Sequence, residues 1–382
     1  MGIAELTRNA VDVLPEGGLE AKLKLGRPLR VKLGIDPTGP DIHLGFAAVL
    51  NRLRAFQDEG HIAVLIVGDY TARIGDPSGR SVERQVLPDD VLDANAKLFA
   101  EQAYRILDRE RTELRFNGEW LGKLDYAELV RLTRTGTVAR LLERDDFAKR
   151  FGRHEPISVS ELLYPFAQGY DSVAVEADVE VGGTDQLYNL LMGRDVMANY
   201  GLDPQMVITY ELLVGTDGAG KMSKSVGNYV GIDDAPEEQF GKVMSIPDSA
   251  LPQWWRLTLD CEPPEAEPME SKLALARAIV ARYHSEDAAR AAEEHFTRVV
   301  RHHEAPEEVP ERPLPGGDPV HLPAVLADAF GLSTSEARRL ITQGGVKLDG
   351  DTVNELDLPR QRLTGAVLQA GKRRFVRLNG AA

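Results

Sequence analysis

The chain has 382 residues, of which 43% are hydrophobic and 27% charged, as in ordinary globular proteins with two or three domains. The longest apolar run near a candidate span, Ile62 to Val67, is far too short for a membrane helix, and the N-terminus lacks the pattern of a secretory signal. The single cysteine, Cys261, excludes an internal disulfide and suits a reducing compartment. We therefore expect a cytoplasmic protein that does not enter a membrane.

Charge is unevenly distributed along the chain. The net charge of −15 at first argues against a nucleic-acid partner, because phosphate binding needs a basic surface. Residues 333–382, however, contain nine Lys and Arg against five Asp and Glu, which leaves the remainder at −19. An acidic body with a basic tail is typical of a catalytic part with an RNA- or anion-binding appendage. A solvated basic patch explains the count equally well.

The first elements predict a βαβ unit. Residues 29–35 have the pattern of a strand, and apolar residues then recur at helical spacing from Leu44 until Gly60, a typical helix stop. Residues 61–68 form an apolar run, as expected of a strand buried on both faces of a parallel sheet. This order predicts a doubly wound α/β fold with a parallel sheet.

The central part continues this alternation. Helices expected at 87–107 and 126–144 belong to an insertion that crosses between the halves of the sheet. The following elements are a strand at 179–183, a helix at 184–200, a strand at 206–214 and a glycine-rich loop at 215–220.

The C-terminal part is expected to be helical at first, with clear helices at 271–283 and 288–302. A compact α+β unit at the end contains a helix at 335–342, a strand at 346–348, a hairpin at Asp349-Gly350 and a strand at 375–378. The expected domains are a catalytic domain at 1–232 with an insertion at about 118–178, a helical domain at 233–302, a Pro- and Glu-rich linker at 303–323 and the α+β unit at 324–382.

Three segments at strand ends or helix starts carry polar residues suited to a ligand, since loops at the carboxyl ends of parallel strands converge on one crevice. In the first, Asp36 to Phe46, His43 lies at a helix N-terminus, where free N–H groups and the helix dipole favour phosphate. Gly45 leaves room for a nucleotide ring against the backbone. A lone histidine at a helix start is more often a cap or a surface residue.

The second segment is Lys221-Met222-Ser223-Lys224-Ser225, which follows a loop with three glycines. Two lysines three residues apart on a mobile loop can both reach a polyphosphate. A solvated lysine loop is the competing interpretation. The third segment, Gly182 to Gln186, has the pattern of a glycine turn followed by an N-cap and by itself indicates no function.

Together these segments resemble the class I aminoacyl-tRNA synthetases, whose two signatures are written HIGH and KMSKS. The resemblance is greatest to the bacterial tyrosyl-tRNA synthetases, in the family's order and over nearly the whole chain. It rests on residues 33–46, Ile74 to Arg80, Tyr164 to Asp171, Gly182 to Gln186 and the lysine segment. Residues 335–350 resemble the alpha-L RNA-binding motif of those enzymes, which favours the RNA interpretation of the basic tail.

The resemblance implies a Rossmann-like catalytic domain and two reactions. Tyrosine is activated with ATP to tyrosyl-adenylate, and the tyrosyl group is then transferred to the 3′ end of tRNA(Tyr). ATP carries Mg²⁺ as a co-substrate; we expect no bound cofactor and no metal held by the protein alone. The implied catalytic residues are Thr38, His43, Lys221 and Lys224. The implied ATP-binding residues are Asp36, His43, Gly45, Phe46, Gly183, Asp185, Lys221, Ser223 and Lys224.

An amino-acid pocket is the most specific expectation. Tyr164, Gln168 and Asp171 stand at i, i+4 and i+7, on one face of a helix. A buried Asp171 could accept the phenol proton of tyrosine while Tyr164, Gln168 and Asp76 receive the ammonium group. A structural acid in an ordinary helix is the competing interpretation. The full set implied to bind tyrosine is Lys32, Gly34, Asp36, Asp76, Tyr164, Gln168, Asp171 and Gln186.

The resemblance also implies contacts with tRNA through Arg80, Arg84, Arg338 and Arg339, and a homodimer built on the insertion between about Leu121 and Tyr164. For single arginines on a loop, plain solvation is an equally good explanation.

This sequence departs from the family pattern at three positions. Phe46 replaces the second histidine of the HIGH signature, Lys32 stands where many relatives have tyrosine, and Glu180 where many have glutamine. A charged Lys32 could pair with Asp171 or Glu180. Two alternatives stay open, a tryptophan-activating synthetase and a catalytically degenerate RNA-binding paralogue. Another nucleotidyl transferase with a His-x-Gly helix start does not explain the RNA-binding tail.

Overall fold

A computed structural model describes residues 2–39, 41–78, 87–224, 226–298, 309–371 and 374–379. The chain forms two compact units, Met1–Asp234 with Lys242–Leu275, and Ala235–Gly241 with Ala276–Ala382. No helix within the described ranges is long and apolar enough to cross a membrane.

The first unit is built on a six-stranded sheet with the order β1-β6-β5-β2-β3-β4. Its strands are β1 (Ala10–Leu14), β2 (Arg30–Ile35), β3 (Ile62–Val67), β4 (Thr112–Phe116), β5 (Val179–Gly183) and β6 (Met206–Tyr210). All neighbouring pairs are parallel except β1 with β6. The expected doubly wound α/β fold is therefore confirmed, with β1 as an antiparallel edge strand.

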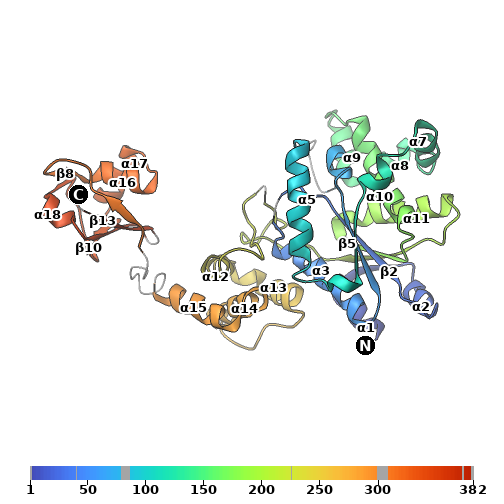
Figure 1. Cartoon of the computed structure of the whole chain (residues 1–382), viewed down its shortest axis with the longest axis horizontal. Helices are drawn as coiled ribbons and strands as arrows, with labels where there is room; N and C mark the ends of the chain where they lie inside the picture. Colours follow the sequence, from blue (N-terminus) through green and yellow to red (C-terminus); the bar gives the residue numbers. More distant parts are fainter. Residues whose placement is uncertain are drawn as a thin grey trace. The chain divides into compact units, whose positions relative to one another are not determined.

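Helices cover both faces of this sheet, α3 and α5 on one side and α10 and α11 on the other (Figure 1). The helices before the strand β6 are α1 (Ile3–Leu6), α2 (Gly18–Leu23), α3 (Leu44–Asp58), α4 (Thr71–Ile74), α5 (Asp89–Ala103), α6 (Gly118–Leu121), α7 (Tyr126–Thr133), α8 (Val138–Leu142), α9 (Asp145–Gly152), α10 (Val159–Ala174) and α11 (Leu187–Asn199). Along the chain, β3 and then β4 are added on one side of β2, and β5 and then β6 are added on the opposite side of β2. The carboxyl ends of β2 and β5 thus border the point where the strand order reverses, which is where open α/β sheets bind ligands.

Local sequence explains why these elements begin and end where they do. β3 is almost wholly buried, which accounts for its continuous apolar run, and Gly60 before it has a φ of 89° that permits the sharp exit from α3. The helix α10 starts with a capping box in which Ser158 and Glu161 satisfy each other's backbone N–H groups.

Two details differ from the sequence-based expectation. The helix expected at 126–144 is divided into α7 and α8, because Thr137 caps a new helix start and Gly136 packs closely against Phe166. The sequence did not predict the strands β1 and β4. Their residues are only partly buried or exposed, so they show no clear apolar pattern.

Between β6 and β7 the described chain is mainly helical, with α12 (Pro236–Met244), α13 (Leu251–Leu259), α14 (Pro268–Tyr283) and α15 (Glu286–Phe296) and a 3-10 turn at Asp248–Ala250. Two further 3-10 turns, Arg109–Arg111 and Thr184–Gln186, lie earlier in the chain.

The C-terminal part of the second unit combines a five-stranded sheet, β10-β9-β12-β13-β7, with a two-stranded sheet, β11-β8. Its elements are β7 (Glu311–Pro313), β8 (Val320–His321), α16 (Leu322–Phe330), α17 (Thr334–Thr342), β9 (Val346–Leu348), β10 (Asp351–Thr352), β11 (Asp357–Leu358), α18 (Arg360–Leu363), β12 (Val367–Ala370) and β13 (Arg374–Asn379). The expected hairpin is present, with positive φ at Asp349 and Gly350 between β9 and β10.

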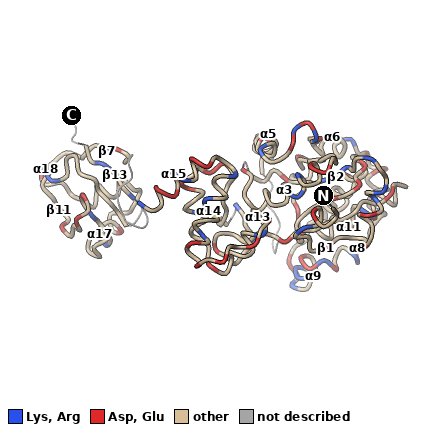
Figure 2. Tube along the Cα trace, turned by 90° about the horizontal axis from the view of Figure 1, so that it is seen from below, with Lys and Arg blue, Asp and Glu red and all other residues tan. Residues whose placement is uncertain are grey.

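The segment 303–323, expected as a linker, is structured where it is described. β7 pairs with β13, and β8 pairs with β11, so residues 311–323 belong to the C-terminal fold. Figure 2 shows acidic positions along α15 and basic positions on α18 and β13 within this unit.

Candidate active site

A cavity of about 400 Å³ opens at the carboxyl ends of β2 and β5 in the first unit. This volume lies in the range of small-molecule sites. The sequence-predicted residues that line it are Gly34, Asp36, Thr38, His43, Gly45, Phe46, Asp76, Tyr164, Gln168, Asp171, Gly183, Asp185, Gln186, Lys221, Ser223 and Lys224. Segments far apart in the sequence therefore meet around one space.

The histidine segment connects the end of β2 to the start of α3. His43 is the extended residue just before α3, and its ring stacks on Phe46 with centroids 4.4 Å apart. Burial, and then the nearby charges of Lys224 and Lys221, lower the pKa of His43 to about 3. The ring is thus neutral at physiological pH, and among the described residues no partner reaches its buried Nδ1. A neutral imidazole can bind a phosphate as a hydrogen-bond donor, without a charge of its own.

The lysine segment is fixed beside this helix start by backbone contacts. Val214 and Lys221 form a β-bridge, and the turn between them is closed by the bond from Gly215 N to Gly220 O at 2.8 Å. Further along, Leu44 N donates to Val230 O at 2.9 Å, and His43 forms a bridge with Gly231. These contacts bring the two distant motifs to the same cavity.

The two lysines occupy different places. Lys224 lies over Gly39, where a β-carbon would come within 2.8 Å of its Cδ and the lysine side chain would have to shift. Burial lowers the pKa of Lys224 to about 8, against the opposing effect of Asp41. The Nζ of Lys221 forms an ion pair with Asp185 Oδ2 at 2.8 Å. One cation thus faces the histidine side of the cavity and the other the β5 side.

Asp36 follows the end of β2 and bonds to residues of α4 and α10. Its Oδ1 accepts from Thr71 Oγ1 at 2.7 Å and its Oδ2 from the Tyr164 hydroxyl at 3.0 Å. A β-carbon on Gly68 would lie 2.2 Å from Asp36 Oδ1, so only glycine permits this approach.

Asp171 lies at the buried end of the cavity, with 2% of its surface exposed. Trp120 Nε1 donates to its Oδ1 at 2.7 Å and Asn117 Nδ2 to its Oδ2 at 3.2 Å. Burial raises the pKa of Asp171 to about 7, although Lys32 and the two donors favour its charged form. Sequence reasoning missed Trp120 and Asn117, because single polar residues after β4 carry no recognisable pattern.

Lys32, expected to contact the substrate, does not line the cavity. Its side chain is fully buried and forms an ion pair with Glu180 at 2.9 Å, its register partner on β5. Its Nζ also donates to Gln168 O and Ser172 Oγ, and Gln168 Nε2 donates to Glu180 Oε1 at 3.1 Å. Of the two partners that the sequence offered for Lys32, the structure pairs it with Glu180, and this ion pair lies behind the cavity wall formed by Gln168.

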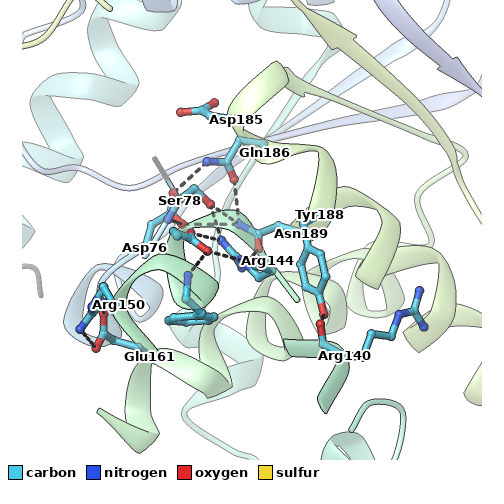
Figure 3. Close-up of polar contacts among 12 residues, drawn as sticks. Asp76, Ser78, Arg140, Arg144, Arg150, Glu161, Asp185, Gln186, Tyr188 and Asn189 are labelled. Atoms are coloured by element: carbon cyan, nitrogen blue, oxygen red, sulfur yellow. Dashed lines mark hydrogen bonds and ion pairs between the residues drawn. The ribbon is translucent and has the colours of Figure 1, made fainter. Parts of the chain in front are cut away.

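A second cluster of hydrogen-bonded polar residues, the Asp76 group, consists of Asp76, Ser78 and Gln186. Gln186 Nε2 donates to Asp76 Oδ2 at 2.8 Å, and Ser78 N donates to Asp76 Oδ1 at 2.9 Å (Figure 3). Gly183 was expected to allow close approach of a ligand, but a β-carbon there would meet Leu212 at 2.5 Å, so part of its space is occupied by protein.

The residues expected to contact RNA are not part of this cavity. Arg338 and Arg339 are exposed on α17 in the second unit, whose N-terminus has a capping box between Ser333 and Glu336. Arg80 and Arg84 lie outside the described residues. Within the described ranges no group of three or more His, Cys, Asp or Glu side chains is arranged to hold a metal ion.

The arrangement suits the binding of a polyphosphate ester beside a small zwitterion. Lys224 and a neutral histidine border one part of the cavity, and Lys221 lies on the β5 side beside Asp185. Carboxylates with oriented amides surround the remaining part. No serine, cysteine or histidine in the lining is paired as an activated nucleophile among the described hydrogen bonds, so the chemistry this site supports is positioning and charge stabilisation.

Comparison with known proteins agrees with this chemistry. Residues 24–301 match the family model of tRNA synthetases class I (W and Y). The chain is 48% identical to the tyrosine–tRNA ligase of Moorella thermoacetica, covering 98% of this chain and 94% of the relative. It is 47% identical to the tyrosine–tRNA ligase of Thermotoga maritima, covering 98% and 96% respectively.

Solved structures with the same fold include a C-terminally truncated mitochondrial tyrosyl-tRNA synthetase of Aspergillus nidulans, at a TM-score of 0.61 and 21% identity over 76% of this chain and 91% of that one. Another is the tyrosyl-tRNA synthetase of Archaeoglobus fulgidus in complex with L-tyrosine, at a TM-score of 0.60 and 20% identity over 76% and 98%.

Proposed function

The chain belongs to the class I tRNA synthetases of the tryptophan and tyrosine family, and we propose that it is a tyrosine–tRNA ligase. It activates tyrosine with ATP to tyrosyl-adenylate and transfers the tyrosyl group to the 3′ end of tRNA(Tyr). The observation that carries the choice of tyrosine is Asp171, a buried carboxylate at the end of the cavity.

In the first step the tyrosine carboxylate attacks the α-phosphorus of ATP, and pyrophosphate leaves. The protein supplies no covalent nucleophile, so its contribution is to align the reactants and to stabilise the charge that grows on the leaving group. Thr38 and His43 bind the terminal phosphates from the β2 side, and Lys221 and Lys224 approach from the lysine segment. Mg²⁺ enters as the complex with ATP.

The rest of the nucleotide lies along the cavity wall. Asp185 accepts hydrogen bonds from the ribose hydroxyls, since a carboxylate can accept two at once. Gly45 and the Phe46 ring form the surface beside the base, with Asp36, Gly183 and Ser223 around it. Stacking of Phe46 on His43 keeps this surface ordered despite the loss of the second signature histidine.

The amino acid occupies the inner part of the cavity. Asp171 accepts a hydrogen bond from the phenol hydroxyl. Tyr164, Gln168 and Asp76 receive the ammonium group, and Gln186 lies near the substrate carboxylate, next to Gly34 and Asp36. Phenylalanine would offer no hydrogen bond to the buried Asp171 carboxylate, which would keep only Trp120 and Asn117 as donors. A lost hydrogen bond to a charged group costs about 1.5–3 kcal/mol. Lys32 acts from behind the wall, through Glu180 and Gln168.

We propose that the basic C-terminal unit binds tRNA through Arg338 and Arg339, with Arg80 and Arg84 near the acceptor end. Cytoplasmic ATP and tRNA are the substrates, and the exposed thiol of Cys261 suits that reducing compartment.

A homodimer is proposed on the insertion. Tyr126 is 82% exposed, Phe151 62% and Val159 74%, so α7, α9 and α10 each leave a large apolar side chain that a partner could cover. Sedimentation at several concentrations tests this: a monomer at micromolar concentration would contradict it.

The decisive experiment is ATP–pyrophosphate exchange measured with each amino acid in turn. Exchange dependent on tyrosine alone is expected. Exchange with tryptophan in its place would mean that Asp171 accepts the indole N–H, and tight tRNA binding without any exchange would mean a degenerate paralogue.

A further inference from the structure

A buried arginine of the insertion contacts the Asp76 group from outside the cavity. Arg144 directly precedes α9, and its side chain is 4% exposed. Its Nη1 donates to Asn189 Oδ1 at 2.8 Å and its Nη2 to Ser78 Oγ at 3.1 Å (Figure 3). Arg144 and Asn189 do not line the cavity, whereas Asp76, Ser78 and Gln186 do.

The guanidinium determines the direction of the hydrogen bonds that follow. Arginine has only donors, so Asn189 must turn its amide oxygen toward Arg144. The amide nitrogen of Asn189 then donates to Gln186 Oε1 at 3.0 Å, and this contact turns Gln186 Nε2 toward Asp76 Oδ2 at 2.8 Å. Asp76 is therefore surrounded by donors and is held as an acceptor.

The guanidinium itself is firmly fixed. Asp146 accepts from Arg144 Nε at 3.1 Å and from Nη2 at 2.8 Å, a two-point contact that defines the plane of the group. Its Cζ lies 4.8 Å from the ring centre of Tyr188 and 5.2 Å from that of Phe147. Because a carboxylate and two aromatic rings hold the guanidinium of Arg144, its orientation is fixed, and it can orient the side chains that it contacts.

We propose that Arg144 is a positioning residue for the amino-acid substrate, which holds the Asp76 carboxylate, through Asn189 and Gln186, in the orientation that receives the substrate ammonium group. The inference rests on the proposed function and adds to it the insertion's contribution to the substrate site. Arg144 touches no reacting atom. Its loss therefore affects binding of the amino acid and leaves binding of ATP unchanged.

The test uses the full-length chain with Arg144→Met, which keeps much of the apolar contact, and Arg144→Lys, which keeps the charge beside Asp146 but loses the planar fork. KM for tyrosine and KM for ATP are measured by pyrophosphate exchange. Inhibition by 3-(4-hydroxyphenyl)propionate, a tyrosine analogue without the ammonium group, is measured in parallel. Arg144→Met is expected to raise KM for tyrosine about tenfold or more, the scale of a lost hydrogen bond to a charged group. KM for ATP and inhibition by the analogue are expected to change less than about twofold, because neither ligand uses the Asp76 ammonium site.

Arg150→Met is the matched control. Arg150 is a buried arginine on the adjacent α9 and pairs with Glu161 of α10 at 2.5 Å (Figure 3). This variant is expected to lower the melting temperature at least as much as Arg144→Met without raising KM for tyrosine.

An equal loss of tyrosine binding and of inhibition by the analogue in Arg144→Met would overturn the inference, because it would indicate a general structural role. Loss of kcat at unchanged KM for tyrosine would overturn it as well. If Arg144→Met does not fold, Arg144→Lys decides by the same comparison. A wild-type chain that shows no exchange with any amino acid would instead overturn the proposed function, and with it this inference.

Discussion

Lys221 Nζ lies 2.8 Å from Oδ2 of Asp185, so the first lysine of the lysine segment occupies the carboxylate proposed to bind the ATP ribose. The Lys221 side chain is 44% exposed, which limits the strength of the pair to at most about 1 kcal/mol. We infer that the ribose and Lys221 compete for this carboxylate, and that binding of ATP releases the lysine toward the phosphates.

Replacement of Lys221 by alanine is therefore expected to have opposite effects on two ligands. Adenosine, which has the ribose but no phosphate, is expected to bind up to about fivefold more tightly, because the competing cation is gone. Adenylate formation from ATP is expected to slow. Calorimetric titration with adenosine measures the first effect. Lys224→Ala, whose side chain lies over Gly39, serves as the control with unchanged adenosine affinity. Weaker adenosine binding in Lys221→Ala would contradict the competition.

His43→Ala and Lys224→Ala are each expected to lower the rate of adenylate formation by about a hundredfold or more, the usual scale for removing one transition-state donor. Both side chains line the part of the cavity proposed to bind the phosphates, so tyrosine affinity is expected to change little. Single-turnover kinetics and equilibrium binding of tyrosine separate the two quantities. Weakened tyrosine binding at an intact rate would remove these residues from the proposed role.

The raised pKa of Asp171 leads us to expect that tyrosine activation depends on pH. The pKa of its buried carboxyl is raised to about 7, so the fraction present as a carboxylate, which can accept a hydrogen bond from the phenol hydroxyl, grows as pH rises from 6 to 8. The value of kcat/KM for tyrosine is expected to increase over this window with an apparent pKa near 7. Asp171→Ala is expected to abolish tyrosine activation. Unchanged activation in that variant would place the phenol elsewhere.

The lowered pKa of His43 leads us to expect that the stability of the folded protein depends on pH. Its folded-state pKa of about 3 lies below the unfolded value of about 6.5, so between these values the unfolded chain binds the extra proton. Stability is therefore lost as pH falls from 6.5 toward 3, by roughly 2 kcal/mol at pH 5 from this group. Urea unfolding of wild type and His43→Gln at pH 7.5 and pH 5 measures the difference. An equal loss of stability in both proteins would show that His43 titrates normally when folded.

Much of the first unit was predictable from local sequence. The apolar run at Ile62–Val67 and the helical spacing after Leu44 gave the βαβ unit, because burial and backbone geometry leave a periodic record in the chain. The spacing of Tyr164, Gln168 and Asp171 likewise placed three side chains on one helix face, and all three line the cavity. Asp349-Gly350 predicted its hairpin because the turn needs positive φ at both residues.

Other features depend on pairs of residues that only the folded chain brings together. Lys32 was expected in the substrate pocket, but its strand register places it opposite Glu180, and a buried ammonium group requires such a partner. Trp120 and Asn117 reach Asp171 from a different segment, and Arg144 reaches Asn189 across the insertion. The sequence alone determined which residue types and local elements are present. The tertiary structure decided which buried charges and donors meet, because a hydrogen bond depends on distances of a few ångströms between residues that the sequence separates widely.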